Sequence, residues 1–145
     1  MRSFVPTKIG DIWMLLDALP VQEVLGARPW VPVPHSSSQI PGVLAWRGRA
    51  IAVFDLCTLL EGGSPLQPGV LRPRTVIVES RACALAMPVD MVHEVGEVDH
   101  AQIRPSHGTK MRHSSGEVEI FGSLAPILDV DQLIAEILTG AGDAS

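Results

Sequence analysis

The sequence predicts a mainly β protein made of two small barrels packed side by side, and two observations lead to this prediction. The chain repeats itself: residues 19–24 return as residues 87–92, and residues 48–59 return as residues 122–133. Runs rich in valine and isoleucine, such as residues 76–78, favour strands. Two copies of about 70 residues are too few for a solenoid, which needs three or more stacked units, but they suit two packed barrels.

The length of 145 residues predicts a single domain over residues 1–145. Each half would be marginally stable alone, so we expect the halves to share buried surface. Within the domain we expect one barrel over about residues 15–65 and a second over about residues 72–128. The N-terminal strand and a C-terminal helix over residues 130–138 are expected to pack across both.

Turn and cap residues mark the elements of the first half. Arg47-Gly48 separates two apolar strands, and glycine supplies the positive φ that a tight hairpin turn requires. Asp55 precedes an apolar segment and is expected to cap a short helix by accepting from its first N–H groups. In chain order, the expected elements are strands within residues 3–16, an extended or short helical piece over residues 20–24, an extended connector over residues 30–34, strands over residues 42–46 and 49–54, and a helix over residues 56–60.

The second half follows after a linker rich in glycine and proline at residues 62–69. Asp129 is expected to cap the last helix, whose apolar residues recur with helical spacing. Residues 104–117 are polar and are expected to form a mobile loop. The remaining expected elements are strands over residues 75–78 and 83–87 with a turn at Ser80-Arg81, strands over residues 118–121 and 123–128, and the helix over residues 130–138.

Composition limits the classes of function. The net charge of −5 comes entirely from residues 66–145, and an acidic half argues against nucleic acid as a partner. The N-terminus lacks the apolar core of a signal peptide, and the apolar runs are too short to insert into a membrane. With only two cysteines, the chain is expected to be a reduced, cytoplasmic protein.

Candidate catalytic and metal-binding residues have simpler explanations. His93, His100 and His107 recur every seven residues, but Pro105 and Gly108 prevent the continuous helix that a metal face would need. Cys57 lies among leucines, which indicates a buried and inert thiol. The sequence contains no P-loop, dinucleotide fingerprint or nucleophile elbow. We therefore expect no catalytic residue, no metal and no cofactor.

Arg47 is the residue with the most informative position. It lies at a tight turn beside Trp46, and arginine and tryptophan are favoured at the centres of protein interfaces. A solvated turn arginine is the simpler interpretation from spacing alone. The equivalent position in the second repeat is Phe121, so the barrel itself does not require an arginine there.

These residues resemble the CheW-like domain family. The resemblance lies in Leu19-Pro20-Val21-Gln22-Glu23-Val24, in Val33-Pro34, and in the segment IPGVLAWRGRAIAVFDL at residues 40–56. The second half resembles the family through residues 89–95 and 126–130. Together these segments extend over about residues 3 to 138.

The resemblance implies a pair of five-stranded SH3-like barrels and an adaptor without catalytic activity. Such adaptors join the signalling tips of methyl-accepting chemoreceptors to the regulatory domain of a chemotaxis histidine kinase, and other CheW-like proteins are further partners. The kinase contact usually engages the end of a barrel, mostly in the second half. Membrane association would come only through the receptors. The receptor groove is implied at Val21, Gln22, Glu23, Val24 and Arg47, with Trp46 as an interface aromatic.

Two alternatives remain at this point. One is a specialised CheW-like adaptor that binds receptors or another adaptor but not the kinase. The other is a small β-barrel enzyme, which would need a cleft that contains a base with a shifted pKa.

Overall fold

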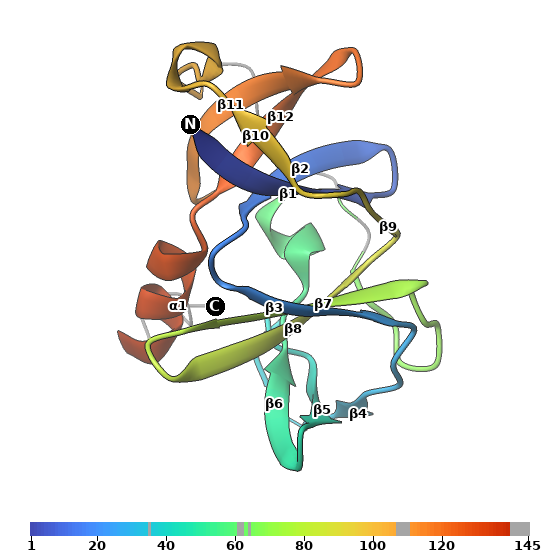
Figure 1. The fold of residues 1–145 in the computed structure, drawn as a ribbon. Coiled ribbons are helices and arrows are strands. Elements are labelled where there is room, and N and C mark those ends of the chain that lie inside the picture. The colour runs from blue at the N-terminus through green and yellow to red at the C-terminus, as the bar shows by residue number, and fades with distance from the viewer. Residues whose placement is uncertain (35, 61–62, 64, 107–110, 140–145) are drawn as a thin grey trace.

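The strands form two six-stranded sheets, one above the other in Figure 1. The computed structural model describes residues 1–34, 36–60, 63, 65–106 and 111–139, so parts of the expected linker and of the expected 104–117 loop lie outside the described residues. One sheet has the order β10-β1-β2-β12-β11, with β9 also pairing with β1, and we call it the terminal barrel. Its strands are β1 (Arg2–Ile9), β2 (Ile12–Asp17), β9 (Met91–Val92), β10 (Gly96–Val98), β11 (Ser114–Ile120) and β12 (Ser123–Leu128).

The second sheet uses the strands between residues 21 and 89, and we call it the middle barrel. Its order is β3-β7-β8-β6-β5-β4. The strands are β3 (Val21–Gly26), β4 (Val31–Pro32), β5 (Gly42–Trp46), β6 (Arg49–Val53), β7 (Arg74–Ser80) and β8 (Cys83–Val89). The sequence predicted a mainly β protein of two small barrels, and this fold class is confirmed. Each sheet has six strands, where the family resemblance implied five.

The first two strands of each half of the chain pair with the later strands of the other half. β1 and β2 lie in the terminal barrel with β9–β12, and β7 and β8 lie in the middle barrel with β3–β6. β2 pairs in parallel with β12, with Leu15 opposite Ile127. β8 pairs in parallel with β6, with Leu85 opposite Ala52. The two parallel pairs occupy equivalent places in the repeat, so the repeat seen in the sequence is built by exchange of hairpins between its halves.

Three apolar clusters fill the molecule. One lies inside the terminal barrel and includes Phe4 and Leu15, and one lies inside the middle barrel and includes Trp46. The third, which we call the central cluster, draws buried side chains from both barrels. Its members include Met14, Leu16, Phe54, Leu56, Val76, Val78, Met87, Leu128, Leu133 and Ile134. Shared burial of this kind is what two marginal halves need for stability.

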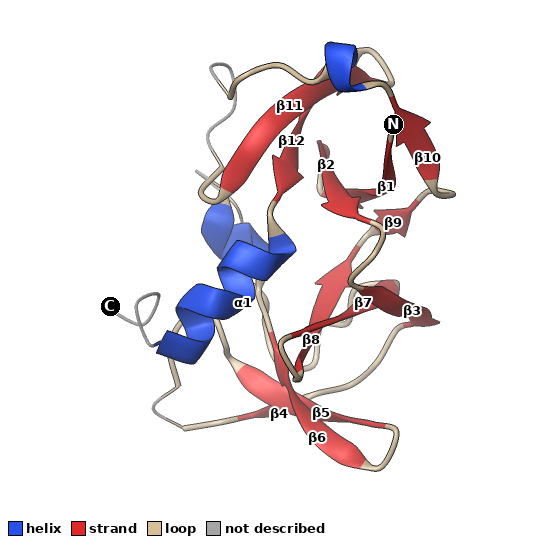
Figure 2. Cartoon of the chain, turned by 60° about the vertical axis from the view of Figure 1, so that its left-hand side comes forward, coloured by secondary structure: helices blue, strands red, loops and turns tan. Residues whose placement is uncertain are grey.

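The helices fill and cover the space between the barrels. The 3₁₀-helix η1 (Leu56–Leu59) lies between them, and α1 (Val130–Thr139) lies along one side (Figure 1, Figure 2). A second 3₁₀-helix, η2 (His100–Gln102), follows β10. Val130, Leu133 and Ile134 of α1 are buried in the central cluster, so the helix seals one side of the shared core.

The two aspartates cap the two helices as predicted. The Asp55 carboxylate accepts from Cys57 N at 3.0 Å and, with its other oxygen, from Leu66 N at 2.9 Å. The Asp129 carboxylate accepts from Gln132 N at 3.0 Å in the first turn of α1. Asp55 is buried and also ties the linker to η1, whereas the cap at Asp129 is exposed.

The structure corrects several expectations. The sheets do not follow the expected ranges 15–65 and 72–128, because residues 74–89 pair within the middle barrel and residues 2–17 within the terminal barrel. Residues 21–26 form strand β3, which is the extended one of the two alternatives expected for residues 20–24, whereas Ser114 onward is strand β11 rather than loop. Proline is accommodated inside β1, because Pro6 lies between the segments where β10 and β9 pair with that strand.

We expect Asp55→Ala to lower the free energy of unfolding more than Asp129→Ala does. The first change leaves two buried N–H groups without acceptors and should cost about 2–4 kcal/mol. The second removes one exposed cap and should cost about 1 kcal/mol. Urea denaturation of both variants measures the difference, and equal losses would show that Asp55 acts only as a helix cap.

Candidate functional site: two exposed hairpin turns

The turn between β5 and β6 holds Arg47 in a strained backbone conformation. Arg47 has φ 48° and Gly48 has φ 76°, so both central residues lie in the left-handed region that a type I′ turn requires. Glycine adopts this region freely, but a side-chain-bearing residue other than asparagine or aspartate does so at a cost. The Arg47 side chain is 62% exposed. The turn therefore presents an arginine to solvent at the expense of stability.

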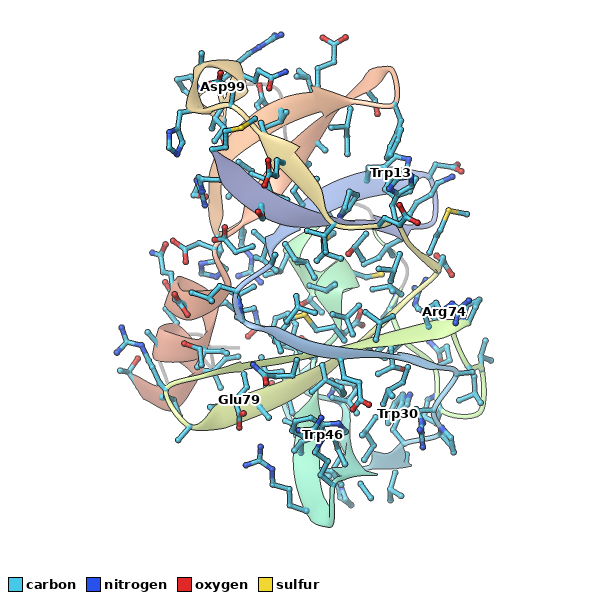
Figure 3. The ribbon with its side chains drawn as sticks, in the orientation of Figure 1. Trp13, Trp30, Trp46, Arg74, Glu79 and Asp99 are labelled. Carbon is cyan, nitrogen blue, oxygen red and sulfur yellow. The ribbon has the colours of Figure 1, made fainter. Side chains whose placement is uncertain are left out.

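Glu23 and Trp46 hold this turn through a hydrogen bond, a cation–π contact and an ion pair. The Trp46 indole N–H donates to Glu23 Oε1 at 2.8 Å, and the Arg47 guanidinium lies 4.7 Å from the Trp46 ring centroid. An Arg47 guanidinium nitrogen also lies 3.8 Å from Glu23 Oε1. The structure thus brings together three of the residues that the sequence predicted for the receptor groove and its rim. Trp46, labelled in Figure 3, is only 5% exposed, so its ring belongs to the core of the middle barrel rather than to an exposed interface.

A β-bulge divides the other predicted residues between the two faces of β3. The register shifts between Val21, which pairs with Val78, and Glu23, which pairs with Ile77. Val21 therefore faces the central cluster, and Val24 follows it on the same face, with 42% of its surface exposed. Gln22 occupies the bulge and is exposed. The four residues of the Val-Gln-Glu-Val segment do not form one continuous surface.

The terminal barrel carries an equivalent turn with a different side chain. Phe121 has φ 47° and Gly122 has φ 81°, the same pair of left-handed residues as at Arg47-Gly48. Phe121 is 57% exposed and packs with tilted ring geometry between Trp13, with ring centroids 4.7 Å apart, and His93, at 5.0 Å. A large apolar side chain thus occupies the exposed, strained position in this barrel.

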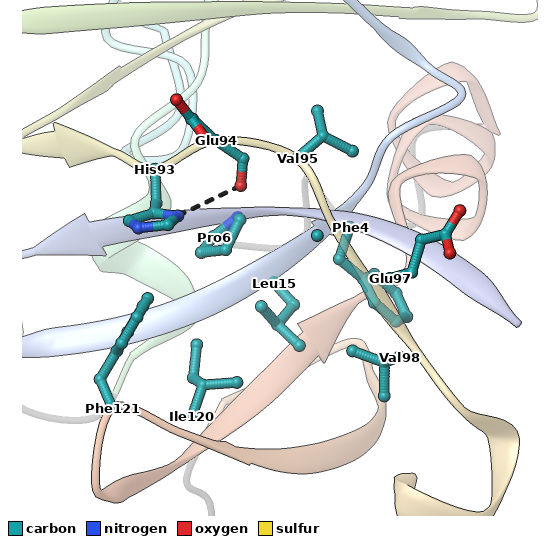
Figure 4. Close-up of a pocket in the computed structure, with 11 residues that line it drawn as sticks. Phe4, Pro6, Leu15, His93, Glu94, Val95, Glu97, Val98, Ile120 and Phe121 are labelled. Atoms are coloured by element: carbon teal, nitrogen blue, oxygen red, sulfur yellow. Dashed lines mark hydrogen bonds between the residues drawn. The ribbon is translucent and has the colours of Figure 1, made fainter.

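Beside Phe121 the terminal barrel is open. A hollow of about 310 Å³ reaches the barrel interior between β10 and the β11–β12 turn (Figure 4). Glu94 and Glu97 line the hollow and add negative charge to it. The main apolar side chains around the hollow are Phe4, Leu15, Val95, Val98, Ile120 and Phe121.

The two barrels differ at the repeat position just before this turn. Ile120 in the terminal barrel stands where Trp46 stands in the middle barrel, at the repeat offset of the two turns. Trp46 fills the middle barrel and reaches across to Glu23 on β3, which links the sheet at that place. Ile120 is smaller and has no indole N–H, so the hollow remains. The alignment of the repeats contains this signal, but only the packing shows that a space results.

The ionisable groups of the described residues offer no catalytic centre. Burial, and then the nearby Asp55 carboxylate, raise the pKa of the Cys57 thiol to about 11, so it stays protonated at neutral pH. Within the described residues, no three histidine, cysteine or carboxylate side chains gather as a metal site. In the same part of the chain, no helix has the length and apolar character to cross a bilayer.

Two joined β-barrels with exposed, differently occupied turns and no catalytic centre among the described residues define a protein-binding module. The chain belongs to the CheW-like domain family, whose model matches residues 3–138. Proteins of this family are non-catalytic adaptors, which agrees with the absence of catalytic motifs in the sequence.

Named relatives agree with this family. The chain is 24% identical over 139 residues to the "Probable chemotaxis protein CheW" of Rhizobium etli, covering 93% of this chain and 88% of the relative. It is 25% identical over 105 residues to the chemotaxis protein CheW of Rhizobium meliloti, covering 72% and 66% of the two chains. The crystal structure of the scaffolding protein TtCheW from Thermoanaerobacter tengcongensis has the same fold, with a TM-score of 0.77, 24% identity, and 91% and 86% of the chains covered.

We expect Arg47→Asn to leave the free energy of unfolding unchanged or to raise it by about 0.5–1 kcal/mol. Asparagine tolerates the left-handed region, and Asn-Gly is a preferred type I′ pair. The exposed ion pair with Glu23 that is lost is worth little. Thermal and urea denaturation measure the change, and a loss above 1 kcal/mol would make Arg47 a structural residue.

Proposed function

We propose that this chain couples chemoreceptors to a chemotaxis histidine kinase, with one partner on each barrel. The observation that carries the proposal is the pair of equivalent turns, each of which holds an exposed side chain in a strained conformation. Backbone strain of about 1–3 kcal/mol is enriched at functional sites. The β7–β8 turn also holds Arg81 and Ala82 at positive φ, so the side chains that the Arg47 and Phe121 turns present carry the proposal together with the strain. The two turns present chemically different side chains, which suits two different partners.

The receptor signalling tip is assigned to the middle barrel, around β3 and the Arg47 turn. A receptor tip is a helical hairpin, and amphipathic helices bind in grooves with apolar floors and polar rims. Val24 offers exposed apolar surface on β3, and the Arg47 guanidinium offers donors for a carboxylate or a helix carbonyl. Trp46 and Glu23 hold the arginine turn in place.

The kinase regulatory domain is assigned to the open end of the terminal barrel. The hollow beside Phe121 is mainly apolar and accepts a large apolar side chain of a partner, which is how interface anchors bind. Phe121 and Val95 add exposed apolar surface around it. An adaptor that binds receptors but not the kinase would leave this surface for a second adaptor instead, and binding measurements with each partner distinguish the two proposals.

We expect Arg47→Ala to weaken binding of a chemoreceptor signalling-tip fragment by about 1–3 kcal/mol, because a charge-assisted hydrogen bond is lost. Arg47→Lys should restore only part of the affinity, since it keeps the charge but not the planar fork. Isothermal titration with the purified tip fragment measures both. Arg81→Ala is the matched control, because Arg81 has φ 53° in the β7–β8 turn and is also exposed. An equal loss of affinity in both variants would contradict the assignment.

We expect Phe121→Asn and Ile120→Trp to weaken binding of the kinase regulatory domain at least tenfold, each for a different reason. Asparagine keeps the turn conformation but removes the ring, and tryptophan at position 120 fills the hollow as Trp46 does in the other barrel. Affinity for the receptor tip should stay within about twofold, because distant sites act independently. If kinase binding survives both changes, the open end of the terminal barrel is not the kinase site.

A further inference from the structure

One carboxylate joins the two barrels on the side opposite α1. Asp90 lies where the chain leaves β8 of the middle barrel and enters the terminal barrel. Its Oδ2 accepts from Gly10 N at 2.6 Å, in the β1–β2 turn, and from the Arg72 guanidinium at 2.9 Å. The Asp90 backbone N–H donates to Lys8 O at 2.9 Å. We call Asp90, Arg72 and Gly10 the latch.

Arg72 brings two further segments to the latch. It belongs to the segment that joins the halves of the chain, and one of its guanidinium nitrogens lies 3.2 Å from Cys57 Sγ in η1. The Arg72 side chain is only 17% exposed. A shielded ion pair with a shared acceptor is stronger and more directional than an exposed one.

The latch exists at only one of the two crossovers between the barrels. The repeat offset that relates residues 19–24 to residues 87–92 makes Gln22 the repeat equivalent of Asp90. Gln22 is exposed, and its amide approaches only the nearby Pro20 O, at 3.5 Å. The pseudo-symmetry of the fold therefore does not require the latch, which indicates that Asp90 has a specific task.

The position of the latch indicates that task. On the α1 side, the barrels are joined by the buried face of the helix and by the Ser80 hydroxyl, which donates to Asp131. The β1–β2 turn lies at the other side of the molecule (Figure 1). A backbone bridge between Leu60 and Met111, beside which Arg112 N donates to Leu59 O at 3.0 Å, also joins the two barrels. The aliphatic central cluster holds the barrels together but is non-directional, so it resists separation more than rotation.

We propose that Asp90 and Arg72 set the orientation of the terminal barrel on the middle barrel, and thereby position the Phe121 turn relative to the Arg47 turn. The latch closes the side opposite α1, and without it the terminal barrel rotates about its α1 attachment. A hollow of about 330 Å³ beside Gly10, Cys57 and Leu60 gives the β1–β2 turn room to shift. Asp90 and Arg72 are positioning residues in this account, and their role in coupling rests on the proposed function.

The geometric part is tested by residual dipolar couplings, which report the orientation of each barrel in a common frame. In the wild-type protein, couplings from the two barrels should fit one alignment tensor. In Asp90→Ala and in Arg72→Met they should require two, and the Gly10 amide should exchange about tenfold to a hundredfold faster. If either variant fails to fold, Asp90→Asn and Arg72→Lys replace them. A single shared tensor in the folded variants would overturn the proposal.

Asp17→Ala is the matched control. The Arg2–Asp17 pair has the same 2.9 Å distance but lies within the terminal barrel, so its loss should leave one tensor. Two tensors in the control as well would show that any lost ion pair loosens the barrels, which would overturn the specific role of the latch.

The coupling part is tested separately with the receptor tip, the kinase and this adaptor together. Affinity for each partner alone should stay within about twofold in Asp90→Asn, since neither binding turn is altered. Receptor-dependent stimulation of kinase activity should fall several-fold. Unchanged stimulation in a variant whose barrels have reoriented would overturn the link to coupling, whereas absence of any receptor or kinase binding by the wild-type protein would instead contradict the proposed function.

Discussion

The exchange of hairpins between the two halves is the constraint on which the rest of the structure depends. The parallel pairs β2–β12 and β6–β8 place the first strands of each half inside the barrel of the other half. The terminal barrel is therefore built from two separate pieces of chain, residues 2–17 and 91–128, and the middle barrel is the continuous piece between them. The central cluster fills the interface that this exchange creates, which explains how two marginal units form one stable core.

Pseudo-symmetry sets the positions of the surface features, and single side chains make them different. The same type I′ turn presents Arg47 on one barrel and Phe121 on the other. The residue before each turn differs as well: Trp46 is buried in the core of the middle barrel, whereas Ile120 borders the hollow of the terminal barrel. A repeated fold with unequal turns provides two distinct surfaces at a fixed separation, which is the physical requirement for an adaptor.

The best-placed carboxylates of this protein are used in structure. Asp55 and Asp129 accept from helix N–H groups, Glu23 accepts from an indole, and Asp90 accepts from a turn amide and a guanidinium. These contacts hold the starts of two helices, the Arg47 turn and the junction of the two barrels.

The sequence by itself determined the fold class, the repeat, the Arg47-Gly48 turn and the two helix caps, because these depend on local patterns of apolar, glycine and aspartate residues. It did not determine which strands share a sheet, since pairing between residues 15 and 127 depends on contacts distant in the chain. Burial of Trp46, the hollow beside Ile120 and the contact from Asp90 to Gly10 also came only from the tertiary structure. Each depends on how the exchanged hairpins pack, because a side chain becomes core, rim or latch only when distant strands meet around it.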